Sequence, residues 1–207
     1  MSKTKKRKLE KELYEGIKFC NVEQCLLALE SGANIETRYF TSSFTPLMLA
    51  VAELNTSIVE ILLERGAHVN AQSRMGNSPV HYSLASNLPL LIAHSADINI
   101  KNESSQTPLM SAIWQRDVEK VQILLSNNAS LSDVNDLNET PYMQSLKQRD
   151  IEVERTMYLG SIGVDNLTNE NSKFNVYLSQ IESKRTLISR MIHSEIEERS
   201  LRCLRTD

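Results

Sequence analysis

The amino-acid sequence predicts an all-α solenoid built from short helix–turn–helix units that stack side by side. Four hexamers begin with Thr or Ser followed by Pro: TPLMLA at 45–50, SPVHYS at 78–83, TPLMSA at 107–112 and TPYMQS at 140–145. They are spaced by 33, 29 and 33 residues, and a second element keeps step with them: SGANIE from Ser31, RGAHVN from Arg65, HSADIN from His94 and NNASLS from Asn127. Stretches between the two elements, such as IVEILL at 58–63, have apolar residues at helical spacing. Such a unit cannot bury its apolar face alone, so it must stack on its neighbours.

The unit that begins at Thr45 shows how each element is expected to form. The Thr45 hydroxyl caps a helix, and Pro follows at the first helical position, where an N–H would lack a partner anyway. A short helix is therefore predicted from Pro46 to Glu53, and a second one from Thr56 to Glu64. Gly66 ends the second helix, because the chain needs a positive φ there. The polar residues 67–77 then form a turn that leads to the next Ser-Pro.

These features resemble the ankyrin repeat, whose pattern contains Thr-Pro-Leu-His-x-Ala and recurs every 33 residues. The resemblance covers residues 11–165, as five units with divergent outer copies. Only SPVHYS keeps the histidine of the pattern, His81, whereas Met48, Met110 and Met143 take its place in the other hexamers. The resemblance implies that His81 hydrogen-bonds the neighbouring loop. It also implies that partners bind on the concave face formed by the turn tips and the first helices.

The sequence divides into three parts. Residues 1–10 are basic and are predicted to form a disordered tail, residues 11–165 form the repeat domain, and residues 166–207 form a C-terminal helical cap or extension. In the last part, apolar residues at helical spacing predict one or two helices from about residue 172 to about residue 204. Three roles stay open for this segment: packing on the last repeat, self-association, or binding a partner.

The third unit is shorter than the others. It has 17 residues from its Ser-Pro to the end of its second helix, where the preceding unit has 21. Four residues make about one helical turn, so we expect a notch about 6 Å deep in the outer helix layer. Pro89 would open the shortened helix, and Leu88, Leu91 and Ile92 would stay in phase with the stack. The deletion is either a tolerated surface change or a seat for another segment.

Composition and motifs argue against catalysis and against several classes of ligand. The net charge of −3 gives no overall field that would attract nucleic acid or an anionic membrane. No catalytic motif, phosphate-binding loop or zinc-ligand spacing occurs, so no enzyme activity, cofactor or metal is expected. The cysteines, Cys20, Cys25 and Cys203, have no framework spacing and indicate free thiols in a reducing compartment.

A cytoplasmic location is expected from the same evidence. No apolar run approaches the roughly 18 residues of a membrane span, and the charged start is not followed by the apolar region of a signal peptide. The basic cluster Lys3–Lys8 leaves alternatives open: a plain disordered tail, a nuclear localisation signal, or an arm that contacts phosphate. Delivery of the protein into a host cell is a further alternative.

Two features single out a surface for a protein partner. The first turn tip, RYFTSSF at 38–44, carries three aromatic residues in a chain that is only 5% aromatic. Trp114, the only tryptophan, falls at an exposed position of a first helix, and such residues are enriched at interfaces. Two alternatives stay open, namely that Phe44 folds back on the stack and that Trp114 shields the gap left by the short unit. The predicted protein-binding residues are Arg38, Tyr39, Phe40, Arg74, Met75, Trp114 and Gln115.

The sequence therefore predicts a non-catalytic adaptor that binds an unidentified protein and is a monomer rather than a homodimer. Its tips change from cationic (Arg38, Arg74) to anionic (Glu103, Asp136, Glu139), a gradient that would orient a partner. Two alternatives remain. One is a scaffold that self-associates through the C-terminal helix, and the other is an effector of a pathogen or symbiont that binds a host protein.

Overall fold

The computed structural model of the chain describes residues 2–148, 153, 156 and 157. Within these residues there are nine helices and no strand: α1 (Lys3–Lys18), α2 (Val22–Glu30), α3 (Pro46–Ala52), α4 (Thr56–Glu64), α5 (Pro79–Tyr82), α6 (Leu88–Ala93), α7 (Pro108–Gln115), α8 (Val118–Ser126) and α9 (Pro141–Gln148). The chain divides into two compact units, Met1–Ser161 and Ile162–Asp207, and the described residues all belong to the first. The helices predicted between residues 172 and 204 lie outside the described residues, and the predicted domain boundary at 165 stays a prediction.

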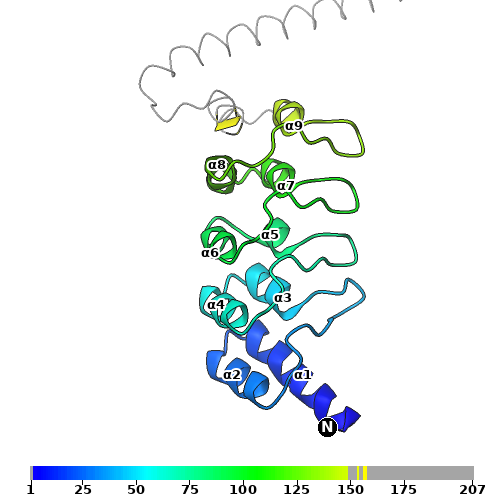
Figure 1. Cartoon of the computed structure of the whole chain (residues 1–207), viewed down its shortest axis with the longest axis vertical. Helices are drawn as coiled ribbons and strands as arrows, with labels where there is room; N and C mark the ends of the chain where they lie inside the picture. Colours follow the sequence, from blue (N-terminus) through cyan, green and yellow to red (C-terminus); the bar gives the residue numbers. More distant parts are fainter. Residues whose placement is uncertain (1, 149–152, 154–155, 158–207) are drawn as a thin grey trace, which may run out of the picture. The chain divides into compact units, whose positions relative to one another are not determined.

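The helices form a two-layered stack, which confirms the predicted all-α solenoid. The first helices of the units (α1, α3, α5, α7, α9) make one column, the second helices (α2, α4, α6, α8) make the other, and the turn tips project beyond the first helices (Figure 1). Each first helix contacts the next along the series. A continuous apolar core runs between the columns from Leu13 of α1 to Leu124 of α8. Stacking therefore buries the apolar faces that a single unit would leave in water.

The hexamers start helices by the expected capping chemistry. The Thr45 hydroxyl accepts a hydrogen bond from the Met48 backbone N–H at 3.2 Å, and Pro occupies the first turn of α3. Thr107 does the same for Met110 at the start of α7, at 3.4 Å. At the end of α4 the chain turns through Gly66 with φ of +84°, which is a conformation that glycine adopts without steric cost.

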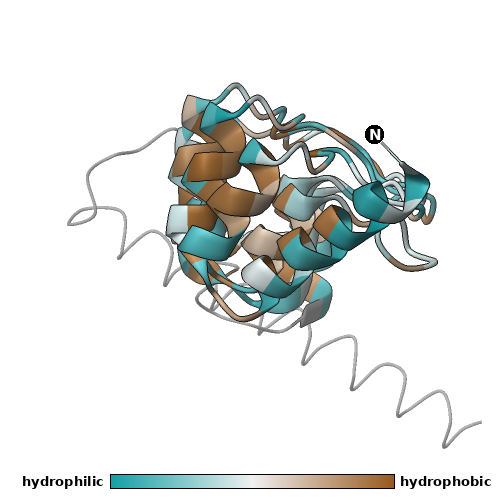
Figure 2. Ribbon diagram, turned by 90° about the horizontal axis from the view of Figure 1, so that it is seen from below, coloured by the Kyte–Doolittle hydropathy of each residue, from teal (hydrophilic) through white to brown (hydrophobic). Residues whose placement is uncertain are grey.

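The N-terminal residues correct one prediction. The disordered tail predicted over residues 1–10 is wrong, because residues 3–10 are part of α1. The Ser2 side chain accepts from the Lys5 backbone N–H, and Lys6–Glu10, Lys8–Glu12 and Lys11–Glu15 are ion pairs one helical turn apart. Such pairs each stabilise a helix by about 0.2–0.5 kcal/mol. The first turns of α1 are hydrophilic, as Figure 2 shows next to the N-terminus.

The shortened third unit differs from the prediction in where the loss falls. Helix α5 has 4 residues, against 7 in α3, and α6 has 6 residues, against 9 in α4. Both helices are shortened, so the expected notch confined to the outer layer is wrong. The expected phase is confirmed, since Leu88 and Leu91 are fully buried. The physical reason is that a longer link, residues 83–87 against 53–55, replaces the end of the first helix and the start of the second, while α6 keeps its place in the core.

A buried lysine from the next unit completes the shortened one. Lys120 of α8 is fully buried, and its Nζ donates to the backbone carbonyls of Ser83 at 2.6 Å and His81 at 3.2 Å. A helix of one turn leaves its last carbonyls without intrahelical N–H partners, and the ammonium supplies the missing donors. Burial lowers the pKa of Lys120 to about 8. The equivalent position in α4, the third after the N-cap, is the buried Ile58.

Candidate protein-binding surface

The turn tips are joined to one another by backbone hydrogen bonds. We call residues 38–44, 73–77, 102–106 and 135–139 the first to fourth tips. Arg74 N–H donates to the Ser42 carbonyl at 2.9 Å, Glu103 N–H to the Met75 carbonyl at 3.0 Å, and Asp136 N–H to the Ser104 carbonyl at 3.3 Å. Each unit thus repeats the same bond to the unit before it. The tips form one ordered row rather than four independent loops.

His81 fixes the third tip to the stack. Its Nδ1 accepts from the Ser78 backbone N–H at 3.1 Å, so its Nε2 carries the proton and donates to the Gln106 carbonyl at 3.1 Å. Burial lowers the pKa of His81 to about 4, which keeps the ring neutral. The expectation that His81 bonds the neighbouring loop is confirmed. The histidine is therefore a structural residue.

Six of the seven predicted binding residues are exposed, Arg38 among them. Phe40 in the first tip is 62% exposed, Met75 in the second tip 64%, and Trp114 near the end of α7 67%. Arg74 and Gln115 are also exposed. The structure thus places large apolar side chains in water along the tips and first helices. The exposure of Trp114 argues against the alternative that this side chain shields the short unit. The short unit is instead completed from inside by Lys120.

Two of the predicted residues hold the first tip in place. Arg38 is exposed, yet its Nη1 donates to the Ser43 carbonyl at 3.0 Å and to the Gln72 carbonyl at 2.8 Å. Tyr39 is half-buried, and its hydroxyl donates to the Glu10 carbonyl of α1 at 2.9 Å. Burial raises the pKa of Tyr39.

Phe44, the third aromatic of the first tip, packs inward as one alternative proposed. Its ring centroid lies 4.8 Å from that of Tyr82 in the third unit. The Phe44 ring therefore packs against the third unit, beneath the first tip.

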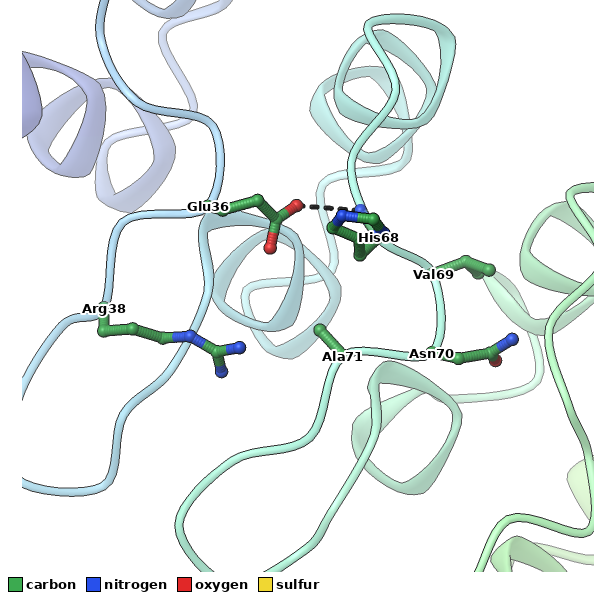
Figure 3. Close-up of a pocket in the computed structure, with 6 residues that line it drawn as sticks. All are labelled: Glu36, Arg38, His68, Val69, Asn70 and Ala71. Atoms are coloured by element: carbon green, nitrogen blue, oxygen red, sulfur yellow. Dashed lines mark hydrogen bonds between the residues drawn. The ribbon is translucent and has the colours of Figure 1, made fainter.

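A shallow hollow lies beside the stems of the first two tips (Figure 3). It is lined by Glu36, Arg38, His68, Val69, Asn70 and Ala71. The Glu36 carboxylate already accepts the His68 backbone N–H at 2.8 Å, so it serves to join the two stems. No group of three or more His, Cys, Asp or Glu side chains arranged to hold a metal occurs among the described residues. The described helices include none that is long and apolar enough to cross a bilayer.

A model of ankyrin repeats, in three copies, matches residues 16–102. The chain therefore contains ankyrin repeats. The B-cell lymphoma 3 protein homolog of Mus musculus is 37% identical over 122 residues, which are 54% of this chain and 27% of that protein. The putative ankyrin repeat protein FPV031 of Fowlpox virus (strain NVSL) is 37% identical over 89 residues, which are 40% of this chain and 26% of that protein. The chain thus spans about a quarter of the length of these two relatives.

A third relative is an enzyme by its name. Phosphocholine transferase AnkX of Legionella pneumophila subsp. pneumophila is 30% identical over 132 residues, which are 59% of this chain and 14% of that protein. Because ankyrin repeats generally bind proteins, these similarities support a protein-binding role for the repeats described here.

The ankyrin stack also exposes apolar residues that are not among the predicted binding residues. They lie at the ends of first helices or at a tip, and each is more than one-third exposed: Phe19, Leu54, Leu84 and Leu137. A signal for Phe19 was present in the sequence. It occupies a first-helix position where the second and fourth units have the polar residues Glu53 and Gln115.

Proposed function

We propose that this ankyrin-repeat protein is a non-catalytic interaction module that binds a protein partner through its tips and first helices. The observation that carries the proposal is the exposure of Met75 and Trp114, two large apolar side chains on the ordered row of tips and on α7. Tryptophan is among the residues whose truncation at interfaces commonly costs about 2 kcal/mol or more. Burying these side chains against a partner would remove apolar surface from water.

The charges around these residues would orient the partner. The Arg74 side chain forms no ion pair with any residue that the structure describes, and it stands in the second tip beside Met75. Glu103 of the third tip is exposed, and its side chain likewise has no ion-pair partner within the described part of the chain. A partner with carboxylates toward the second tip and cations toward the third would match this order.

Capture of partners by tagged full-length chain, followed by mass spectrometry, tests the proposal. The test variant is Met75→Ser/Trp114→Ala, and the matched control is Leu27→Ser, which removes an exposed leucine from α2 in the other helix layer. We expect a partner whose recovery falls about tenfold or more with the test variant and is unchanged with the control. Equal recovery by all three forms, with unchanged circular dichroism, would place the interaction elsewhere on the chain.

We also propose that the protein acts as a cytoplasmic monomer. A self-associating scaffold is the alternative, and light scattering of the full chain separates the two by mass. The effector alternative has one supporting relative in the Legionella protein, but animal and viral relatives match as well. The similarities therefore favour no particular source of the partner.

A further inference from the structure

The N-terminal end of the stack carries a cluster of aromatic side chains around one lysine. We call it the aromatic platform, and its members are Tyr14, Lys18, Phe19, Tyr39 and Phe40. The Tyr14 ring centroid lies 5.3 Å from that of Tyr39 and 5.5 Å from that of Phe40. Lys18 Nζ lies 5.9 Å from the centroids of both the Tyr14 and the Phe19 rings. The platform is thus continuous from the first tip to the end of α1.

Much of the platform faces water. Phe19 is 71% exposed, and Phe40 keeps a similar share of its surface in contact with solvent. Single exposed apolar residues are common, but a contiguous group of them marks an interaction site. Tyr14 is half-buried, its ring packs edge-on against that of Phe40, and Lys18 links it to Phe19.

The platform is held in place before any partner arrives. Tyr39 and Phe44 exchange two backbone hydrogen bonds, at 2.8 and 3.0 Å, which close the turn that carries Phe40. The Tyr39 hydroxyl ties the same tip to α1 through the Glu10 carbonyl. Because the backbone under the rings is already ordered, binding there would cost less conformational entropy than ordering a loose loop.

Lys18 gives the platform a positive charge that no described residue neutralises. Three other lysines of α1, Lys6, Lys8 and Lys11, each pair with a glutamate four residues later. The residue four positions after Lys18 is Val22, and Lys18 forms no ion pair within the part of the chain that the structure describes. Its ammonium stands among aromatic rings, which favour a cation but leave its donors free for an anion.

We propose that the aromatic platform is a second protein-binding site, for a peptide segment in which a carboxylate stands next to an aromatic or long aliphatic side chain. The apolar side chain packs on the Tyr14 and Phe40 rings, and the carboxylate pairs with Lys18 beside Phe19. This inference adds a surface to the proposed function. It uses neither Met75 nor Trp114, so the two surfaces can succeed or fail separately.

A nucleic acid fits the platform less well than an acidic peptide. Nucleic-acid affinity comes from several cations that follow the phosphate backbone. Within the platform Lys18 is the one free cation among the described residues, and the neighbouring Lys11 is paired with Glu15. The basic residues 3–8 lie about 15 Å or more away along α1, at 1.5 Å per residue. Single-stranded DNA is therefore the competing ligand in the test.

A library of random 12-residue peptides, displayed on phage and selected against the full-length chain, tests the partner chemistry without a guess at its sequence. Counter-selection uses the Phe19→Ser/Phe40→Ser variant, whose mutated side chains are exposed in the wild type, with circular dichroism to check folding. We expect enriched peptides to carry Asp or Glu beside an aromatic or long aliphatic residue. Enrichment of neutral or basic peptides, or no difference from the counter-selecting variant, would overturn the proposal.

Titration of one enriched peptide then tests Lys18. We expect Lys18→Gln to weaken binding about fivefold to tenfold, since it removes a partly desolvated charge pair. Lys11→Gln, on the same helix, is the matched control and should leave the affinity unchanged. Met75→Ser/Trp114→Ala should also leave it unchanged, which separates this site from the one proposed above. Equal affinities for Lys18→Gln and wild type, or tighter platform-dependent binding of an oligothymidine, would contradict an acidic-peptide site.

Discussion

Lys120 Nζ donates a hydrogen bond to the backbone carbonyl of Ser83 at 2.6 Å, across the boundary between two repeats. The same amine donates to the His81 carbonyl, so one side chain completes the end of the one-turn helix α5. Full burial of the amine gives this contact a large energetic effect, because neither the donors nor the carbonyls have water as an alternative. The short helix of the third repeat therefore depends on Lys120 of the fourth repeat for its hydrogen bonds.

Replacement of Lys120 by Met should destabilise the domain. The variant keeps an apolar stem but leaves the Ser83 and His81 carbonyls without their donor, at an expected cost of about 1–3 kcal/mol. Urea unfolding at pH 9, followed by circular dichroism, measures the difference. Lys11→Met, which changes an exposed lysine of α1, should alter stability by no more than about 0.5 kcal/mol.

The wild type and Lys120→Met should also differ in how their free energies of unfolding depend on pH. Burial lowers the pKa of Lys120 from 10.5 to about 8, so between these values the unfolded chain binds more protons than the folded one. Stability of the wild type therefore rises with pH over this window. We expect its advantage over Lys120→Met to grow between pH 7 and pH 10. A constant difference over that range would show that the amine is not titrating as a buried group.

His81→Met is a substitution that the other repeats already contain, since Met48 and Met110 occupy the equivalent positions and are fully buried. Met cannot donate to the Gln106 carbonyl, so a loss of about 1 kcal/mol is expected at pH 7. Burial lowers the pKa of His81 from 6.5 to about 4, so wild-type stability falls as pH drops through this window, while the variant lacks that loss.

We therefore expect the advantage of the wild type over His81→Met to shrink, and then to reverse, as the pH is lowered from 6.5 to 4. Urea unfolding at half-unit pH intervals measures this. His94→Gln removes an exposed histidine and is the control. A difference that stays constant down to pH 4 would contradict a neutral, buried His81.

The local signals in the sequence were sufficient for the fold. Thr-Pro starts, helical periodicity and Gly66 are all properties of neighbouring residues, and they predicted α3 and α4 to within one residue. The error at the N-terminus had a local signal too. Lysines spaced four residues from glutamates support a helix, although a run of lysines by itself predicts a solvated, disordered tail.

The sequence alone does not predict the contacts between residues that are distant in the chain. Nothing near Lys120 indicates that its amine meets the carbonyls of residues 81 and 83, because that contact depends on how the shortened helix ends. The sequence predicts Tyr39 and Arg38 as partner-binding residues because aromatic and cationic residues in a tip suggest an interface. Their hydrogen bonds to Glu10 and Gln72 come from neighbouring elements that only the stacked structure brings close.

Gly76→Ala should disturb the row of tips. Gly76 has φ of +74°, and a Cβ there would lie 2.6 Å from the Glu103 backbone nitrogen, the donor of the bond between the second and third tips. Gly66→Ala is a matched control, since Gly66 has φ of +84° but no atom within 4 Å of the added Cβ. Both variants carry the left-handed backbone strain of about 1 kcal/mol.

We expect Gly76→Ala to cost at least about 1 kcal/mol more than Gly66→Ala, and to speed hydrogen exchange at the Glu103 amide. Urea unfolding and amide exchange measure the two effects. Equal costs for the two alanines would mean that the tips move apart freely, and the ordered row would then not be a rigid binding surface.

Tyr39→Phe should loosen α1 from the first tip. The substitution removes only the hydroxyl that donates to the Glu10 carbonyl, so a loss of about 0.5–1.5 kcal/mol is expected, together with faster amide exchange in the first half of α1. Tyr14→Phe is the control, because the Tyr14 hydroxyl has no hydrogen-bond partner among the described residues while its ring keeps the same contacts. If both variants behave alike, ring packing rather than the hydroxyl holds α1, and the aromatic platform would then owe its order to the rings alone.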